Sequence, residues 1–338
     1  MFEVYDTLKR LVEIAQPSGF EQPQAKLLAE LAAPYVDEVY TDTLGNVICH
    51  KKGPGKKIMV PAHMDVIGFI VIHIDDEGFL RFAPLGGHSP VNLINTPVIF
   101  ENGVRGCICP DCTADLNTPY LGGLRIDSLY IDIGAADKAE AERMVKPGMA
   151  ARFDFPCEKA AGGNIITPYA DDLIACVTLL MAMERAKKTK NDMYYVFTVQ
   201  EERGLRGARV AARHIAPDVG IAVDVGVCSD LPGENKGTSK THAGGGALIC
   251  VKNGGYISNL PVRDRIRELA DAHKIPWQDE IMSAGSTDSA AIQTSRGGVQ
   301  VGGVSVPNRY AHSPNSVFNI EDAENVAKLI TVIAETEF

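Results

Sequence analysis

The 338-residue sequence is short of positive charge and of long apolar runs. Asp and Glu outnumber Lys and Arg by 43 to 33, which gives a formal net charge of −10. Nucleic acids and anionic membrane surfaces carry negative charge themselves, so an acidic chain is a poor partner for either. The longest apolar stretch, residues 173–183, has 11 residues, whereas a bilayer span needs ~20. We therefore expect no nucleic-acid partner and no membrane span.

Cysteine is sparse as well. Eight cysteines in 338 residues, several of them inside apolar segments, fit reduced core thiols better than a disulfide framework. The first residues carry acids from position 3 onward and no basic stretch before an apolar run, so we expect no secretory signal. These features predict a cytoplasmic protein. One motif, CxCPDC at Cys107, Cys109 and Cys112, could be a redox pair or a soft metal site, but there is no second CxxC, and a structural role is favoured.

Strand-like and helix-like segments alternate along most of the chain. Such alternation favours an α/β fold with a mostly parallel sheet flanked by helices. Residues 66–163 differ, because they consist of short β-like runs broken by Gly and Pro, with one helix-like interval at 138–144. We therefore expect a catalytic α/β domain made of residues 1–65 and 164–338, with a small β-rich domain, residues 66–163, inserted into it.

The strongest chemical signal is a pair of adjacent carboxylates, Glu201 and Glu202. They follow an apolar, β-branched segment at 194–199 and precede the glycines Gly204 and Gly207, so they lie where a buried strand ends. Two neighbouring carboxylates repel each other and are costly to remove from water unless a cation or a proton compensates them. A solvated loop pair is the ordinary alternative for an isolated Glu-Glu dipeptide.

Other potential ligands also stand at the ends of apolar runs. Each of them alone is more often structural than functional, since an Asp before a helix can be an N-cap and a His-x-Asp is a weak motif. In an open α/β sheet, however, such positions converge on one crevice at the carboxyl edge of the strands. The residues are His63 and Asp65, the pair Asp171 and Asp172, Asp224, and His312.

Taken together, these motifs resemble the di-metal aminopeptidases of the M42 family, whose members form tetrahedral shells. The likeness spans essentially the whole chain and includes the inserted β-rich segment. The matching motifs, in order, are HMD at 63–65, DD at 171–172, VQEERGLRGA at 199–208, DV at 224–225 and RYAHSP at 309–314.

The resemblance implies a function and a set of roles. The expected activity is removal of N-terminal residues from short peptides by a water activated between two divalent ions, most simply zinc or cobalt. One ion would be held by His63, Asp171 and Asp224, and the other by Asp171, Glu202 and His312. Glu201 would be the general base, and Asp65 would orient His63. The inserted domain would mediate dimerisation and assembly, giving a homo-oligomer between a dimer and a dodecamer.

Three positions depart from the family pattern, and two other functions stay open. Leu173, Val66 and Asn315 replace an Arg, a Glu and an acid, which affects substrate preference and the tuning of metal affinity rather than the ligands themselves. Some proteins of this group have been labelled endoglucanases, so a glycan hydrolase is one alternative, although adjacent glutamates are poorly placed to face each other across a glycosidic bond. A catalytically weak shell subunit is the other. The resemblance also places loop 285–288 beside the site, where Asp288 either steers a substrate amine or caps a helix.

Overall fold

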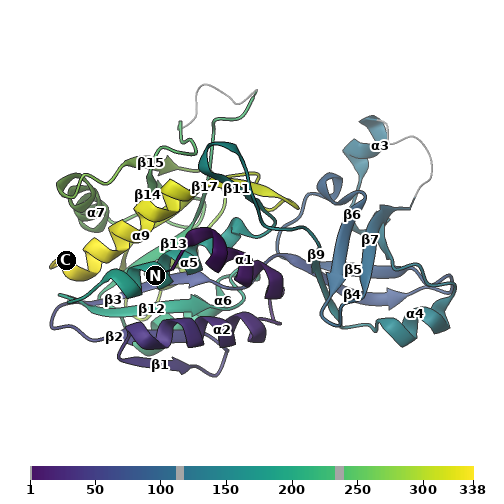
Figure 1. Ribbon diagram of the computed structural model, residues 1–338, viewed down its shortest axis with the longest axis horizontal. Helices are drawn as coiled ribbons and strands as arrows, with labels where there is room; N and C mark the ends of the chain where they lie inside the picture. The colour runs from purple at the N-terminus through teal and green to yellow at the C-terminus, as the bar shows by residue number, and fades with distance from the viewer. Residues whose placement is uncertain (1, 112–117, 233–239) are drawn as a thin grey trace.

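The computed structural model describes residues 2–111, 118–232 and 240–338 and consists of a large α/β unit with a small β-barrel beside it (Figure 1). Along the main path of the large sheet, the central strands run parallel and the outer strands pair antiparallel with their neighbours. In spatial order they are β1 (Glu38–Thr41), β2 (Val47–Lys51), β12 (Asp192–Thr198), β3 (Lys57–His63), β13 (Val219–Val227), β16 (Gln300–Arg309), β17 (Ser316–Asn319), β11 (Asn164–Thr167) and β10 (Glu158–Lys159). A branch from β16 carries β14 (Ala247–Lys252) and β15 (Trp277–Ile281).

Helices cover both faces of this sheet. Successive side chains of a strand point to opposite faces, and in β3 Ile58 and Val60 belong to one buried cluster while Met59 belongs to another. The first cluster lies under α1 (Val4–Ile14), α2 (Gln22–Ala32), α5 (Ala170–Arg185) and α9 (Ile320–Glu335), with α7 (Leu260–Ala272) packed beside α9. The second lies under α6 (Arg206–Ile215) and α8 (Asp288–Gln293).

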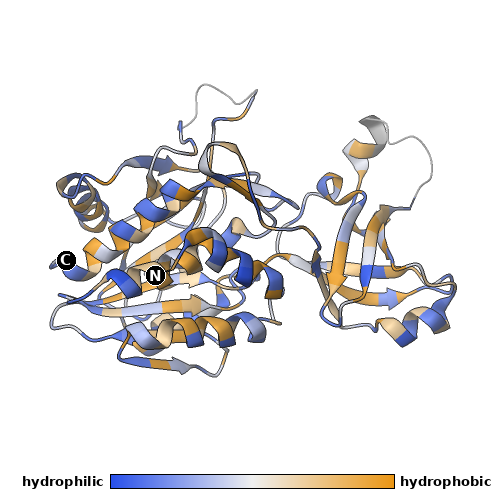
Figure 2. Ribbon diagram, viewed as in Figure 1, coloured by the Kyte–Doolittle hydropathy of each residue, from blue (hydrophilic) through white to orange (hydrophobic). Residues whose placement is uncertain are grey.

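The helices differ in how much of their surface is buried. Figure 2 shows outer helices with one apolar and one polar side, and in α1 the buried residues Val4, Leu8, Leu11 and Val12 form one stripe. Helix α5 is apolar nearly all round and is enclosed by α1, α2, α9 and the sheet. It is the central helix of the large unit, and its first turn lies at the carboxyl edge of the strands.

The segment between β3 and β11 forms the barrel. Its strands close in the order β4 (Gly68–Ile74), β5 (Leu80–Leu85), β8 (Leu129–Asp132), β7 (Arg105–Pro110), β6 (Thr96–Phe100) and β9 (Ala150–Phe153). It also carries α3 (Thr118–Gly123) and α4 (Lys138–Met144). Short 3₁₀ turns are η1 (Ala33–Tyr35), η2 (Pro90–Leu93), η3 (Ile126–Ser128) and η4 (Ala161–Gly163). The α/β fold with an inserted β-rich module that the sequence predicts is confirmed.

The backbone pairing of two central parallel strands ends before the carboxyl edge of the sheet. β3 pairs with β12 over its whole length, but with β13 only through Ile58 and Met59. Pro61, which has no N–H to donate, lies in the part of β3 that β13 no longer accompanies. The backbone pairing of β3 and β13 therefore stops short of the carboxyl edge, where the side chains at the ends of the two strands can converge.

Two further expectations concern membranes and thiols. In the described ranges, no helix is both long enough and apolar enough to cross a membrane. Cys107 and Cys109 lie on β7 as free thiols, and burial raises the pKa of Cys109 to about 11, which makes it a poor nucleophile. Cys112 lies outside the described residues.

Candidate active site

Potential ligands from five segments meet at the carboxyl edge of the sheet. Each side chain stands near a strand end or in the first turn of a helix, as expected for a site at the carboxyl edge of parallel strands. They are His63 at the end of β3, Asp171 at the start of α5, Glu201 and Glu202 after β12, Asp224 in β13 and His312 after β16.

These side chains form three groups whose ligand atoms all lie within 4.8 Å of one another. Two groups share Asp171 and correspond to the two ligand sets that the sequence resemblance implies. The groups are His63 with Asp171 and Asp224, Asp171 with Glu202 and His312, and His63 with Glu201 and Glu202.

His63 is held by one ring nitrogen and faces the cluster with the other. Nδ1 lies 2.9 Å from the backbone carbonyl of Asp65, and Nε2 lies 3.1 Å from Oδ1 of Asp171. A carbonyl only accepts hydrogen bonds, so Nδ1 carries the proton, and the lone pair of a neutral ring points at Asp171. Burial disfavours a charged ring, but hydrogen bonds to Asp171 and Asp65 outweigh this and raise the pKa of His63 well above its usual value. The contact with Asp171 therefore requires a proton or a cation between the two groups.

His312 is arranged in the same way from the opposite side. Its Nδ1 lies 2.9 Å from the backbone carbonyl of Gly87, in the loop that follows β5 of the barrel. Its Nε2 lies 3.4 Å from Oδ2 of Asp171 and 3.5 Å from Oε1 of Glu202. Both histidines thus present Nε2 to the carboxylates of the cluster, with the tautomer fixed by a backbone carbonyl.

The carboxylates carry more negative charge than the surrounding residues neutralise. Burial, reinforced by neighbouring acids, raises the pKa of Glu201 and Asp224 well above their usual values and that of Glu202 to about 7. Within the described chain, the ion pairs of Asp171 and Glu202 are made with histidine alone, and none with lysine or arginine. Crowded buried acids without fixed cations are a site that a divalent ion would stabilise.

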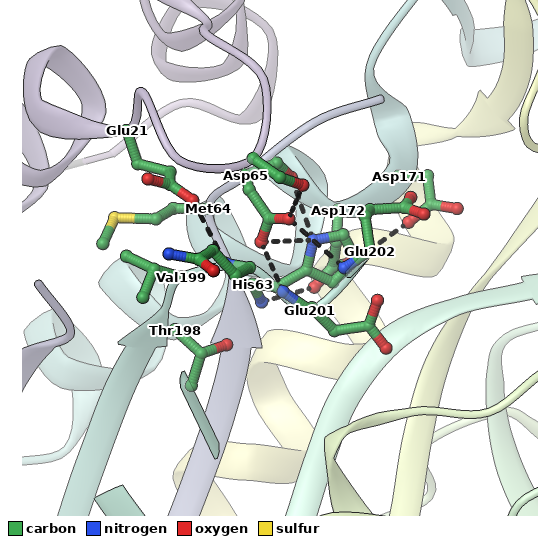
Figure 3. A network of polar contacts seen from close by, with 12 residues as sticks. Glu21, His63, Met64, Asp65, Asp171, Asp172, Thr198, Val199, Glu201 and Glu202 are labelled. Atoms are coloured by element: carbon green, nitrogen blue, oxygen red, sulfur yellow. Dashed lines mark hydrogen bonds and ion pairs between the residues drawn. The ribbon is translucent and has the colours of Figure 1, made fainter. Parts of the chain in front are cut away.

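Asp65 holds the loop that carries the two glutamates. Its carboxylate is fully buried and accepts hydrogen bonds from the backbone N–H of Glu201 (2.9 Å), the N–H of Glu202 (3.2 Å) and Oγ of Ser18 (2.5 Å) (Figure 3). The sequence predicts that this carboxylate orients His63. In the structure the bond to His63 is made by the backbone carbonyl of Asp65, and the nearest carboxylate oxygen lies 3.6 Å from Nδ1. The side chain of Asp65 therefore positions Glu201 and Glu202 more directly than it positions His63.

Two buried acids support the site in ways that the sequence left open. Asp172 accepts a hydrogen bond from the backbone N–H of His63 at 3.1 Å, and its other oxygen has no hydrogen-bond partner among the described residues. Asp288 lies in the first turn of α8, where Thr287 is the N-cap, and accepts from the hydroxyl of Thr198 at 2.6 Å. The dipeptide Asp171-Asp172 was a visible signal for the first, whereas nothing in the sequence links Asp288 to Thr198.

The residues at two of the positions that depart from the family pattern are core residues. Leu173 and Val66 both have 0% of their surface exposed and belong to the main hydrophobic cluster. They pack beside the site without a polar group that could reach it.

A cleft opens from the cluster toward solvent. It has a volume of about 420 Å³, and its walls include Asp171, Asp224 and His312 together with the segment 280–287. The part of this segment from Ser283 to Thr287 lines the cleft with small side chains. The cleft offers room for a side chain and its backbone directly beside the cluster.

Solved structures similar to this one include several that are described as aminopeptidases. An aminopeptidase from the archaeon Desulfurococcus kamchatkensis matches with a TM-score of 0.92 and 36% identity over 98% of this chain and 94% of its own. The Pyrococcus horikoshii TET1 peptidase, described as assembling into a tetrahedron or a large octahedral shell, matches with a TM-score of 0.88 and 29% identity over 98% and 99% of the two chains. A Thermotoga maritima structure described as an endoglucanase matches less well, with a TM-score of 0.80 and 31% identity over 97% and 96%. Fold and site together define a hydrolase of the aminopeptidase class.

Sequence comparison gives the family. The M42 glutamyl aminopeptidase family matches residues 45–329. A protein from Acetivibrio thermocellus is 41% identical over 97% of both chains, and the lysyl aminopeptidase of Pyrococcus furiosus is 35% identical over 98% of this chain and 96% of its own. The chain belongs to the M42 peptidase family.

The residues present fit the metal ions on which this family depends. Imidazole nitrogen and carboxylate oxygen are the donors that zinc and related divalent ions take in proteins. Here two imidazoles with fixed tautomers face a shared carboxylate, and one oxygen of the neighbouring Asp172 lacks a partner among the described residues. The donor set is therefore suited to divalent cations, with Asp171 common to both candidate groups.

Proposed function

We propose that this protein is a metal-dependent aminopeptidase that removes single residues from the N-termini of short peptides. The observation that carries the proposal is the placement of His63 and His312 on opposite sides of Asp171, each with Nε2 turned toward it. A carboxylate shared between two ligand groups is the arrangement that two-ion peptidases require.

The ligand assignment follows the two groups that share Asp171. His63, Asp171 and Asp224 would hold one divalent ion, and Asp171, Glu202 and His312 would hold the other, with zinc or cobalt the best match to the donors. When bound, the ions supply Lewis acidity, which polarises the scissile carbonyl and makes water more acidic.

Glu201 is the residue proposed to move the proton. It lies in the cluster with 9% of its surface exposed, and it belongs to neither of the two groups that share Asp171. A carboxylate spared from ligation can accept the proton of the attacking water and pass it to the leaving amine. Its N–H is held by Asp65, so the position of its backbone is fixed before substrate arrives.

The cleft sets the substrate class. Its volume of about 420 Å³ accommodates one residue at the reacting position rather than a long bound chain. The ions that Asp171 and Asp224 would help to hold beside this space would supply a binding point for the lone pair of a free, neutral α-amine, which an amide nitrogen does not offer. This favours peptides with a free N-terminus over internal peptide bonds.

The test combines metal content with turnover. Glu201→Gln should retain both ions and lose turnover by several orders of magnitude, whereas Asp171→Ala should lose metal from both groups, measured as ions per chain by elemental analysis. Hydrolysis of a panel of aminoacyl anilides should stop in chelator and return with zinc or cobalt, and N-acetylated substrates should be inert. Equal metal loss in the two variants, or a fully loaded protein that cleaves none of the panel, would contradict the proposal. Release of sugar that continues in chelator would favour a glycan hydrolase instead.

We further propose that residues 1–65 and 164–338 form the catalytic domain and that residues 66–163 form an assembly domain. The TET1 relative forms large shells, and the barrel exposes apolar side chains such as Ile72 (58% exposed) and Val91 (44% exposed), as expected of a surface that another copy covers. Light scattering coupled to size exclusion should give the mass of a homo-oligomer, between a dimer and a dodecamer. A monomeric mass would contradict this.

A further inference from the structure

The loop that follows β5, residues 86–88, belongs to the barrel but contacts one of the two ligand groups. We call this group, Asp171 with Glu202 and His312, the second ligand group. The backbone carbonyl of Gly87 accepts the hydrogen bond of His312 Nδ1 at 2.9 Å, although the two residues are 225 positions apart. His312 is 41% exposed at its side chain, so few packing contacts restrain its ring. Among the described residues, Gly87 supplies the hydrogen bond that orients this ring toward Asp171 and Glu202.

Gly86 fits against the other member of the same group. A Cβ at this position would stand 2.9 Å from Oε2 of Glu202 and 2.5 Å from Cγ2 of Ile67. Both distances are below any normal contact, and Ile67 is buried and cannot withdraw easily. Gly86 also has a φ of +82°, which favours glycine. Glu202 thus rests against barrel backbone that no side chain covers.

His88 ties the loop to the barrel. Its Nε2 lies 3.0 Å from the carbonyl of Gly68 and 3.3 Å from that of Leu85, and its ring stacks on Phe69 at 4.7 Å. Burial lowers the pKa of His88 to about 4, so the ring is neutral at working pH and Nε2–H is the donor to the carbonyls. The loop therefore has a fixed position relative to the barrel strands.

We propose that loop 86–88 of the barrel positions Glu202 and His312 and so sets the metal affinity of the second group, while the group of His63, Asp171 and Asp224 is independent of it. The proposal rests on the proposed function, since it presumes two ions. It gives the inserted segment a part in building the site. Partners that orient ligand side chains commonly change metal affinity about 10- to 100-fold when they are altered.

The test is a matched pair of glycine variants in one barrel. Gly86→Ala brings a Cβ against Glu202 and Ile67, whereas Gly103→Ala, at a φ of +87°, meets nothing within 4 Å. The backbone penalty for alanine is similar at both positions, so the difference between them reports the contacts of the new Cβ with Ile67 and Glu202. Zinc titration of metal-free protein by calorimetry, with ions per chain counted after dialysis, should show two unchanged sites for Gly103→Ala. Gly86→Ala should keep one unchanged site and weaken the other at least 10-fold.

Each other outcome overturns something specific. If Gly86→Ala binds both ions like Gly103→Ala, or weakens both sites equally, the positioning role is refuted. If the wild-type protein does not bind two ions, the proposed function fails first. If Gly86→Ala does not fold, as judged by circular dichroism, His88→Phe tests the proposal instead. This variant keeps the aromatic stacking on Phe69 and removes the N–H that donates to the carbonyls of Gly68 and Leu85. It should weaken the same single site about 10-fold, and an unchanged titration refutes the proposal.

Discussion

The buried carboxylate of Asp65 allows a sharp prediction, because its three hydrogen bonds cannot all survive replacement by an amide. Oδ1 accepts from the N–H of Glu201, and Oδ2 accepts from the N–H of Glu202 and from Ser18 Oγ. In Asp65→Asn the amide oxygen can take only one of these two places. Whichever it takes, the NH₂ group faces the backbone N–H of Glu201 or of Glu202, and two donors oppose each other in a site with no solvent access.

The magnitude follows from that mismatch. A hydrogen bond to a charged group contributes about 1.5–3 kcal/mol, and a buried donor left without an acceptor costs about 1–3 kcal/mol. Asp65→Asn should therefore lower the free energy of unfolding by about 3 kcal/mol, measured on metal-free protein by urea denaturation. Turnover should fall on the order of 100-fold, since a displacement of about 1 Å in a reacting group has an effect of that size.

Ser18→Ala is the matched control for Asp65→Asn. It removes one hydrogen bond to the same carboxylate and leaves both N–H bonds to the glutamate loop intact. We expect the free energy of unfolding to fall by about 1.5 kcal/mol and turnover to stay within a few-fold of wild type. If Asp65→Asn stays within about 0.5 kcal/mol of wild type, or if the two variants lose turnover equally, the assigned role of Asp65 is refuted.

Three further predictions concern other parts of the chain. Burial raises the pKa of Glu280 to about 7 from 4.5, so the folded state binds the proton more tightly and loses stability as pH rises from about 4.5 to 7. Glu280→Gln should remove this dependence of stability on pH and raise the free energy of unfolding at pH 8 by about 3 kcal/mol relative to wild type. If the urea midpoints of the two proteins change with pH in the same way, this prediction is contradicted. Thr198→Val removes the hydrogen bond of 2.6 Å that Asp288 accepts and should lower the free energy of unfolding by about 1–3 kcal/mol in urea denaturation. An unchanged urea midpoint would exclude a stabilising role for this contact. Ile72→Glu, at a position 58% exposed on the barrel, should reduce the oligomer mass in light scattering while zinc stoichiometry stays constant, and an unchanged mass would remove Ile72 from the assembly surface.

The site residues at strand ends could be predicted because the sequence next to each of them marks the end of a strand. His63, Glu201 and Asp224 each follow a run of buried apolar residues, and parallel strands bring such ends to one edge without any knowledge of the side-chain packing. Helix boundaries were similarly accessible where the pattern was strong, as in α4 (Lys138–Met144), which coincides with the predicted interval.

The contacts between the parts could not be predicted in the same way. The bond of Ser18 to Asp65 and that of Thr198 to Asp288 join residues 47 and 90 positions apart, and no local pattern marks either pair. The direction of β17 (Ser316–Asn319) was also beyond the sequence, because so short a strand has the same composition whether it pairs parallel or antiparallel. These features depend on how whole elements pack, and periodicity carries no information about that.

The place of the barrel in the chain explains why it reaches the site at all. The chain leaves the sheet directly after His63 and returns through β11 just before Asp171, so both ends of the insertion are tied to members of one cluster. An insertion at the opposite edge of the sheet could vary freely, as surface loops usually do. This one cannot, because short connections at both ends keep loop 86–88 against His312 and Glu202. A change in barrel geometry is therefore also a change in the surroundings of the second ligand group.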